Sequence, residues 1–186
     1  MKTFPFKKQA KVTDNSLSFE NVNYDVETEV PITTGDHPGS FGFVRKYHIH
    51  EGVDLYCHPG EEVFAVEDGE VVFIEWFTGK NAVPPTEWWR DTRAVHIEGE
   101  SGVIVYGEII EVEGITVGTK VKQGKLIGNV ETVLTKDKGR PTTMLHFELY
   151  KHGSRQSVTW DVGQEKHESL QDPTDLLISS IGNIPE

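Results

Sequence analysis

The sequence predicts an all-β domain that carries an N-terminal arm and one short C-terminal helix. Between residues 41 and 150, short runs rich in Val, Ile, Phe and Tyr alternate with glycine turns, a pattern typical of strands. The chain shows no heptad pattern, low-complexity tract or internal repeat. A length of 186 residues is also enough for one domain to bury a core without disulfides or structural metals.

The first 40 residues are expected to form an arm that packs on the domain. They are polar and contain turn signals, notably TTGDHPGS at residues 33–40. The alternating segment VNYDVETEV, residues 22–30, is the best candidate for a short strand in this arm.

The domain itself is placed at residues 41–177, and four of its segments have the composition of strands. They are EEVFAVEDGEVVFIEWF (61–77), AVHIEGESGVIVYGEII (94–110), GTKVKQGKLIGNVE (118–131) and MLHFELY (144–150). The segment DPTDLLISSIGNIPE predicts one short helix after Pro173, and residues 178–186 are expected to form a tail.

A long loop, FTGKNAVPPTEWWRDT at residues 77–92, separates two of these strands. It is too long for a tight hairpin, and long loops in compact domains often carry function. We expect it to form one wall of the functional cleft, with Trp88 and Trp89 contacting substrate. The alternative is that both tryptophans only cover a sheet edge.

Charge and composition narrow the classes of partner. Acidic residues outnumber basic residues by 30 to 18, for a formal charge of −12, so we expect neither nucleic acid nor a membrane as a partner. The N-terminal segment lacks the apolar stretch of a secretory signal, which favours a cytoplasmic location, and no segment is long enough to span a bilayer. The single Cys57 excludes an internal disulfide.

The segment MLHFELY offers a candidate metal ligand. In a strand, Leu145 and Phe147 share one face, while His146 and Glu148 share the other. The first face suits the core. The second face directs His146 toward a cleft, with Glu148 available to accept a hydrogen bond from its ring.

A second histidine and a carboxylate occur in HEGVDL, residues 50–55. Gly52 and Val53 argue against a helix, so a turn at Gly52 is needed for His50 and Asp54 to converge. Two imidazoles and one carboxylate suit Zn²⁺ and leave the open position that catalytic zinc sites require. Other transition metals are compatible with the same set.

The order of these segments resembles the lysostaphin-type zinc endopeptidases, which cut peptide cross-links in bacterial cell walls. The resemblance covers roughly residues 40 to 177 and includes HEGVDLYCHPGEEVFAVEDGEVV, VYGEI, GTKVKQGKLIGNV, MLHFELY and DPTDLL. It implies His50, Asp54 and His146 as zinc ligands. It also implies an antiparallel β-sheet or sandwich of the duplicated hybrid motif type.

The sequence departs from this family at two positions. Family members have two further histidines near the zinc, and here Glu108 and Met144 stand in their places. Glu108 is the candidate general base. Met144 can neither donate a hydrogen bond nor carry a proton, and loss of one oxyanion donor typically costs about 10² to 10³ in rate.

Other arrangements of the site are open from the sequence. Glu108 can instead fill the fourth metal position and close the site. Tyr106 shares a strand face with Glu108, so both should line the cleft or neither. His48 shares the face of His50 in a regular strand and is a possible substitute for a missing imidazole.

The resemblance therefore implies a zinc-dependent peptidase that acts on peptides, with the peptides of peptidoglycan as candidate substrates. The rival interpretation is an inactive module of the same fold, which retains zinc for shape and uses the loop at residues 77–92 for a ligand or protein partner.

Overall fold

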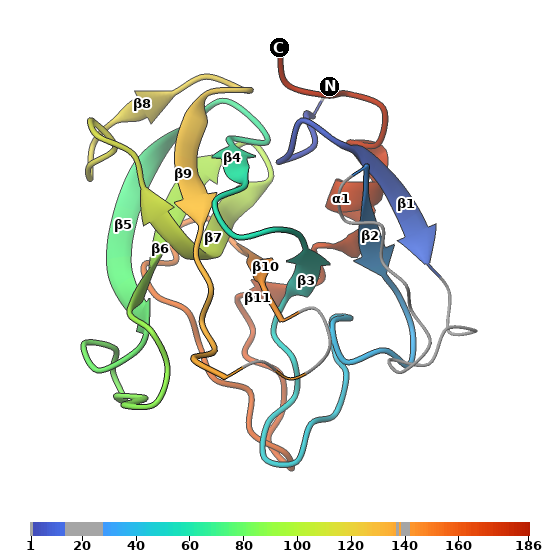
Figure 1. The fold of residues 1–186 in the computed structure, drawn as a ribbon, viewed down its shortest axis with the longest axis vertical. Helices are drawn as coiled ribbons and strands as arrows, with labels where there is room; N and C mark the ends of the chain where they lie inside the picture. The colour runs from blue at the N-terminus through green and yellow to red at the C-terminus, as the bar shows by residue number, and fades with distance from the viewer. Residues whose placement is uncertain (1, 14–27, 137, 139–141) are drawn as a thin grey trace.

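The computed structural model describes residues 2–13, 28–136, 138 and 142–186, and the regular secondary structure of this part consists almost entirely of strands (Figure 1). The strands are β1 (Gln9–Thr13), β2 (Glu29–Thr33), β3 (Val53–Tyr56), β4 (Glu62–Phe64), β5 (Gly69–Thr78), β6 (Thr92–Gly99), β7 (Gly102–Glu111), β8 (Lys120–Val121), β9 (Leu126–Val130), β10 (Met144–Tyr150) and β11 (Leu170–Gln171). One short helix, α1 (Thr174–Ser179), follows them. The all-β prediction is confirmed.

Strand β10 organises the main sheet, which is antiparallel as expected. It pairs with β3, β7 and β11, and the sheet continues from β7 through β6 and β5 to β8. Strand β9 pairs with both β4 and the end of β7. In Figure 1, β10 and β3 consequently lie between the larger group of strands on the left and the β1–β2 pair on the right.

The two faces of β10 follow the predicted alternation. Leu145 and Phe147 are fully buried in the main hydrophobic cluster, whereas Met144 and His146 line a pocket on the other face. The apolar side chains therefore anchor this strand in the core. His146 is held on a rigid element as a result.

The N-terminal residues take part in the same core. Phe4, Phe6, Val30 and Ile32 are each at most 1% exposed and belong to the main hydrophobic cluster. Strands β1 and β2 pair in parallel as a separate small sheet. Of the expected strand at residues 22–30, residues 22–27 lie outside the described residues, and β2 begins at Glu29.

The C-terminal segment returns to the N-terminus. Helix α1 begins directly after Pro173, as predicted, and buries Leu177, but it extends to Ser179 and so enters the segment expected to be a tail. Beyond it, the Asn183 carbonyl accepts a hydrogen bond from the Phe4 amide, so both ends of the chain lie close together at the top of Figure 1. In the described part of the chain, no helix has the length and apolar character needed to cross a membrane.

Candidate metal centre

Strand register brings the two sequence motifs together. Asp54 on β3 lies directly opposite His146 on β10, and His50 precedes β3 by a short turn. Gly52 in that turn passes very close to β10, because a Cβ atom there would lie 2.5 Å from the Phe147 carbonyl oxygen. A glycine is therefore needed at this position for His50 to approach His146.

Three ligand atoms converge at this point. Asp54 Oδ1 lies 2.9 Å from His146 Nδ1 and 3.0 Å from His50 Nε2, and the two ring nitrogens are 3.2 Å apart. Ligands of a tetrahedral ion with bonds of about 2 Å are separated by roughly 3.3 Å. The three atoms therefore need to move apart by only a few tenths of an ångström to surround one ion.

The far nitrogen of each imidazole is already engaged. His50 Nδ1 donates to the carbonyl oxygen of Ser40 at 2.9 Å, and His146 Nε2 donates to Glu148 Oε1 at 2.9 Å. His50 Nε2 and His146 Nδ1, which are hydrogen-bonded to Asp54 Oδ1, can therefore lose their protons and offer lone pairs to an ion. Such outer hydrogen bonds are the usual means by which proteins orient metal-binding histidines.

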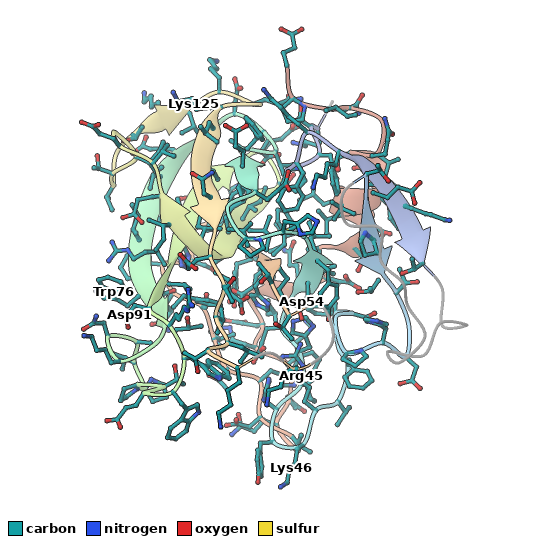
Figure 2. The ribbon with its side chains drawn as sticks, in the orientation of Figure 1. Arg45, Lys46, Asp54, Trp76, Asp91 and Lys125 are labelled. Atoms are coloured by element: carbon teal, nitrogen blue, oxygen red, sulfur yellow. The ribbon has the colours of Figure 1, made fainter. Side chains whose placement is uncertain are left out.

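Electrostatics favours the ligand form of the carboxylate. Burial acts against ionisation of Asp54, but the charge of His50 and hydrogen bonds from His146 and His50 hold the pKa of this carboxyl well below its usual value. Asp54 Oδ2 also accepts a hydrogen bond from Arg45 Nη2 at 2.9 Å. Figure 2 shows Arg45 close to Asp54, between it and the exposed Lys46. Buried, ionised and fixed by Arg45, Asp54 suits a divalent metal such as Zn²⁺.

Glu108 reaches the same pocket through an unusual backbone conformation. It has a positive φ of 62°, the one such non-glycine residue in the described part of the chain. This turn coincides with the point where β7 stops pairing with β10 at Gly107 and starts pairing with β9 at Ile109. Positive φ is uncommon for residues with a Cβ and occurs often at functional sites.

The expectation that Tyr106 and Glu108 share a face is wrong for the same reason. Tyr106 is fully buried in the main core, where its hydroxyl accepts a hydrogen bond from the Val66 amide at 2.9 Å. The left-handed turn at Glu108 breaks the alternation and directs its carboxyl into the pocket. Tyr106 therefore supports the core and does not line the site.

The Glu108 carboxyl is largely removed from water and lies near the charge of Asp54. Burial, followed by the charge of Asp54, raises its pKa to about 8, against the opposing effects of His146 and Arg45. The residue is half-buried overall, but its Oε2 atom is buried and has no hydrogen-bond partner among the described residues. An unpaired buried oxygen of this kind is suited to a ligand, a proton or a metal ion.

A pocket of about 400 Å³ opens beside the cluster. It is lined by Pro38, Arg45, Asp54, Tyr56, Trp89, Glu108, Val133, Leu134, Thr142, Met144 and His146. The loop at residues 77–92 reaches this pocket through Trp89. Phe77, at the start of the loop, packs on the His146 ring, and the two ring centroids are 5.4 Å apart. The loop thus forms part of the wall, as predicted.

The two tryptophans do not have equivalent positions. Trp88 is 73% exposed and lines an adjoining hollow, which Trp89 and Leu134 separate from the metal pocket. Of the two tryptophans, only Trp89 lines both hollows. Adjacent residues on a loop point in different directions, so the sequence does not show which of the two tryptophans lines the metal pocket.

Two residues are placed differently from what the sequence suggests, His48 outside the pocket and Arg45 within it. His48 is half-buried and does not line the pocket. Arg45 lines it, although the sequence pattern does not indicate this, because its approach to Asp54 depends on the turn that joins Val44 to Ile49. An arginine five residues before His50 is the one signal in the sequence.

Removal of the outer carboxylate should weaken metal binding. Glu148 fixes the His146 ring and is itself held by the Ser157 hydroxyl at 2.8 Å. We expect Glu148→Gln to raise the Kd for Zn²⁺ by about 10- to 100-fold, measured by competition with a chelating dye. Glu70→Gln, at an exposed position on β5, is the control. An unchanged Kd in Glu148→Gln would contradict the orienting role.

The raised pKa of Glu108 predicts a pH-dependent stability of the metal-free protein. Between its ordinary pKa of 4.5 and about 8, the native state binds a proton that the unfolded chain has lost. The contribution of Glu108 to stability therefore falls as pH rises through this window. Relative to Glu108→Gln, chelator-treated wild type should lose about 3 kcal/mol of unfolding free energy between roughly pH 5 and pH 8. Equal losses in urea denaturation of both proteins would contradict this.

Comparison with known proteins adds an independent observation. Residues 48–158, more than half of the chain, match the sequence profile of peptidase family M23. This span contains the three converging ligands and Glu108. A search of curated proteins found no match.

Solved structures include chains of similar fold. The chain is 21% identical to cbpa from L. salivarius REN, with a TM-score of 0.52, and the match covers 82% of this chain and 91% of that one. The catalytic domain of the antimicrobial peptidase lysostaphin from Staphylococcus simulans is 19% identical with a TM-score of 0.49, covering 76% and 90%. Csd3 from Helicobacter pylori is 25% identical with a TM-score of 0.42, covering 73% and 36%. At 21% identity, the likeness to cbpa shows a similar fold and nothing more.

Proposed function

Because the chain belongs to peptidase family M23, we propose that it is a zinc-dependent peptidase in which Glu108 acts as the general base. The proposed metal ligands are His50, Asp54 and His146. The fold and the family support a hydrolase, and the geometry of the site supports this assignment of roles.

One observation carries the proposal. The atoms His50 Nε2, Asp54 Oδ1 and His146 Nδ1 lie within 2.9 to 3.2 Å of one another, and Asp54 and His146 line a pocket that Glu108 also lines. Three protein ligands beside an accessible pocket are the arrangement of catalytic zinc sites. A zinc site that only stabilises the fold has no need of a buried carboxyl without a partner.

The residues divide the chemical work between them. When bound, zinc supplies a Lewis acid that polarises a peptide carbonyl and makes water more acidic. Glu108 accepts the proton of the attacking water and can return it to the leaving amine. The positive charge of the ion favours the ionised form of Glu108, which the base requires. Met144, in the same pocket, can contribute only apolar contact.

The substrate is proposed to be a peptide, and cell-wall peptides are the first class to test. M23 peptidases act on peptidoglycan peptides, and the pocket opens along the loop that carries Trp89. An indole wall beside the site suits the apolar parts of a peptide backbone. Tryptophan fluorescence should therefore report peptide binding.

The proposed function is tested by reconstitution with metal. The purified protein is stripped with a chelator, reloaded with Zn²⁺ or with Mg²⁺, and incubated with oligoglycine and peptidoglycan stem peptides, while mass spectrometry follows new peptide termini. We expect cleavage in the zinc sample alone, because two imidazoles suit Zn²⁺ and not Mg²⁺. Zinc-loaded protein that cleaves none of these peptides would contradict the proposal.

A further inference from the structure

Arg45 is positioned within the pocket as a fixed cation. Its Nη2 atom donates to Asp54 Oδ2 at 2.9 Å and to the Pro38 carbonyl oxygen at 2.8 Å. The side chain is 33% exposed and lines the pocket with Glu108 and Trp89. Two acceptors on one nitrogen hold the planar guanidinium in a defined orientation.

The remaining donors of Arg45 are available. Its Nε and Nη1 atoms donate to no group in the part of the chain that the structure describes, and neither is a buried atom without a partner. An arginine whose sole role was to neutralise Asp54 would not need to present its other donors to a pocket. These donors therefore face solvent or a ligand.

The charges around the pocket favour an anionic ligand. Among the described residues that line it, Arg45 is the only arginine or lysine, and Asp54 and Glu108 are the only carboxylates. With a divalent ion bound, the ionised groups of the pocket carry a net positive charge. This contrasts with the formal charge of −12 on the whole chain, so the pocket favours an anion although the protein as a whole is acidic.

We propose that Arg45 is a specificity-determining residue that binds a carboxylate of the substrate next to the scissile bond. Guanidinium groups pair with carboxylates through charge-assisted hydrogen bonds. The apolar side chains of Leu134 and Met144 line the same pocket and suit the uncharged part of a peptide residue. This inference rests on the proposed function, because it concerns the substrate of the same site.

Two sources can supply the carboxylate, and matched peptides distinguish them. In the first pair, one peptide ends in a free α-carboxylate and the other in a carboxamide. In the second pair, both ends are blocked and the residue beside the cleaved bond is Glu or Gln. Kd values come from tryptophan fluorescence with zinc-loaded full-length protein, and kcat/KM values come from peptide cleavage.

We expect wild type to prefer the carboxylate form by about 10- to 100-fold in one of the two pairs, the range of a hydrogen bond between charged groups. Arg45→Gln removes the charge but keeps an amide that can donate to Asp54, and it should reduce the ratio to about one. Arg45→Lys should keep part of the preference. The control Arg90→Gln removes an arginine of the adjacent loop that is paired with Glu131 and lies outside the pocket, and it should keep the wild-type ratio.

Each result decides between the two proposals. If wild type showed no preference in either pair, the role of Arg45 would be overturned. A full preference in Arg45→Gln would also overturn it, because the metal ion alone would then account for the preference. Cleavage without preference contradicts this inference and leaves the proposed function intact. Binding with the expected preference but without cleavage contradicts the proposed function alone.

Discussion

Replacement of Asp54 by alanine is expected to raise the Kd for Zn²⁺ by more than about 100-fold and to abolish peptide hydrolysis. Asp54 is the one anionic ligand of the cluster, and its loss also leaves the charge of Arg45 next to the ion without a counter-charge. Changes outside the ligand shell already cost 10- to 100-fold in affinity, and loss of a ligand should cost more. Zinc affinity is measured by competition titration.

The β core should survive this substitution. The apolar side chains around Asp54, such as Val53 and Leu55, are fully buried and independent of the metal. We expect the far-UV circular dichroism of Asp54→Ala to match wild type. Asp68→Ala, which removes an exposed carboxylate paired with Lys122, is the matched control and should retain zinc. Complete unfolding of Asp54→Ala would instead indicate a structural metal.

Replacement of Glu108 by glutamine should separate catalysis from metal binding. The substitution keeps the shape of the side chain but removes the base, so hydrolysis should fall by about 10² to 10⁴. Zinc affinity should stay within a few-fold of wild type, because Glu108 is not one of the three converging ligands. Rates are compared with Glu113→Gln, a change at an exposed position, which should have wild-type activity.

The rival arrangement gives the opposite pattern. If Glu108 occupied the fourth metal position, Glu108→Gln would weaken zinc binding and wild type would cleave no peptide. An active enzyme whose rate is unaffected by Glu108→Gln would contradict both arrangements. His48 would then be the residue to test, although it does not line the pocket.

The regular parts of the site followed from the sequence. Alternation along β10 placed His146 and Glu148 opposite the core-facing Leu145 and Phe147, because strand periodicity is set by the backbone. Glu148 does accept the hydrogen bond from His146 that this spacing suggested. The turn at Gly52 was also readable, since a glycine there permits close approach to β10.

The irregular parts could not be predicted by periodicity. The positive φ of Glu108 arises where β7 changes partner from β10 to β9, which is a tertiary event. Arg45 and Ser157 reach the site from turns and loops whose positions depend on long-range packing. The burial of Phe4 and Phe6 in the main core likewise depends on contacts with distant strands.

The central claim is that one metal ion binds between three protein ligands and leaves Glu108 free to act on water. The most direct measurement is an anomalous-difference map at the zinc absorption edge from crystals of the zinc-loaded protein. We expect one peak about 2 Å from His50 Nε2, Asp54 Oδ1 and His146 Nδ1, with the Glu108 carboxyl in the pocket but not bound to the ion. A peak elsewhere, or an ion with Glu108 as its fourth protein ligand, would contradict this account.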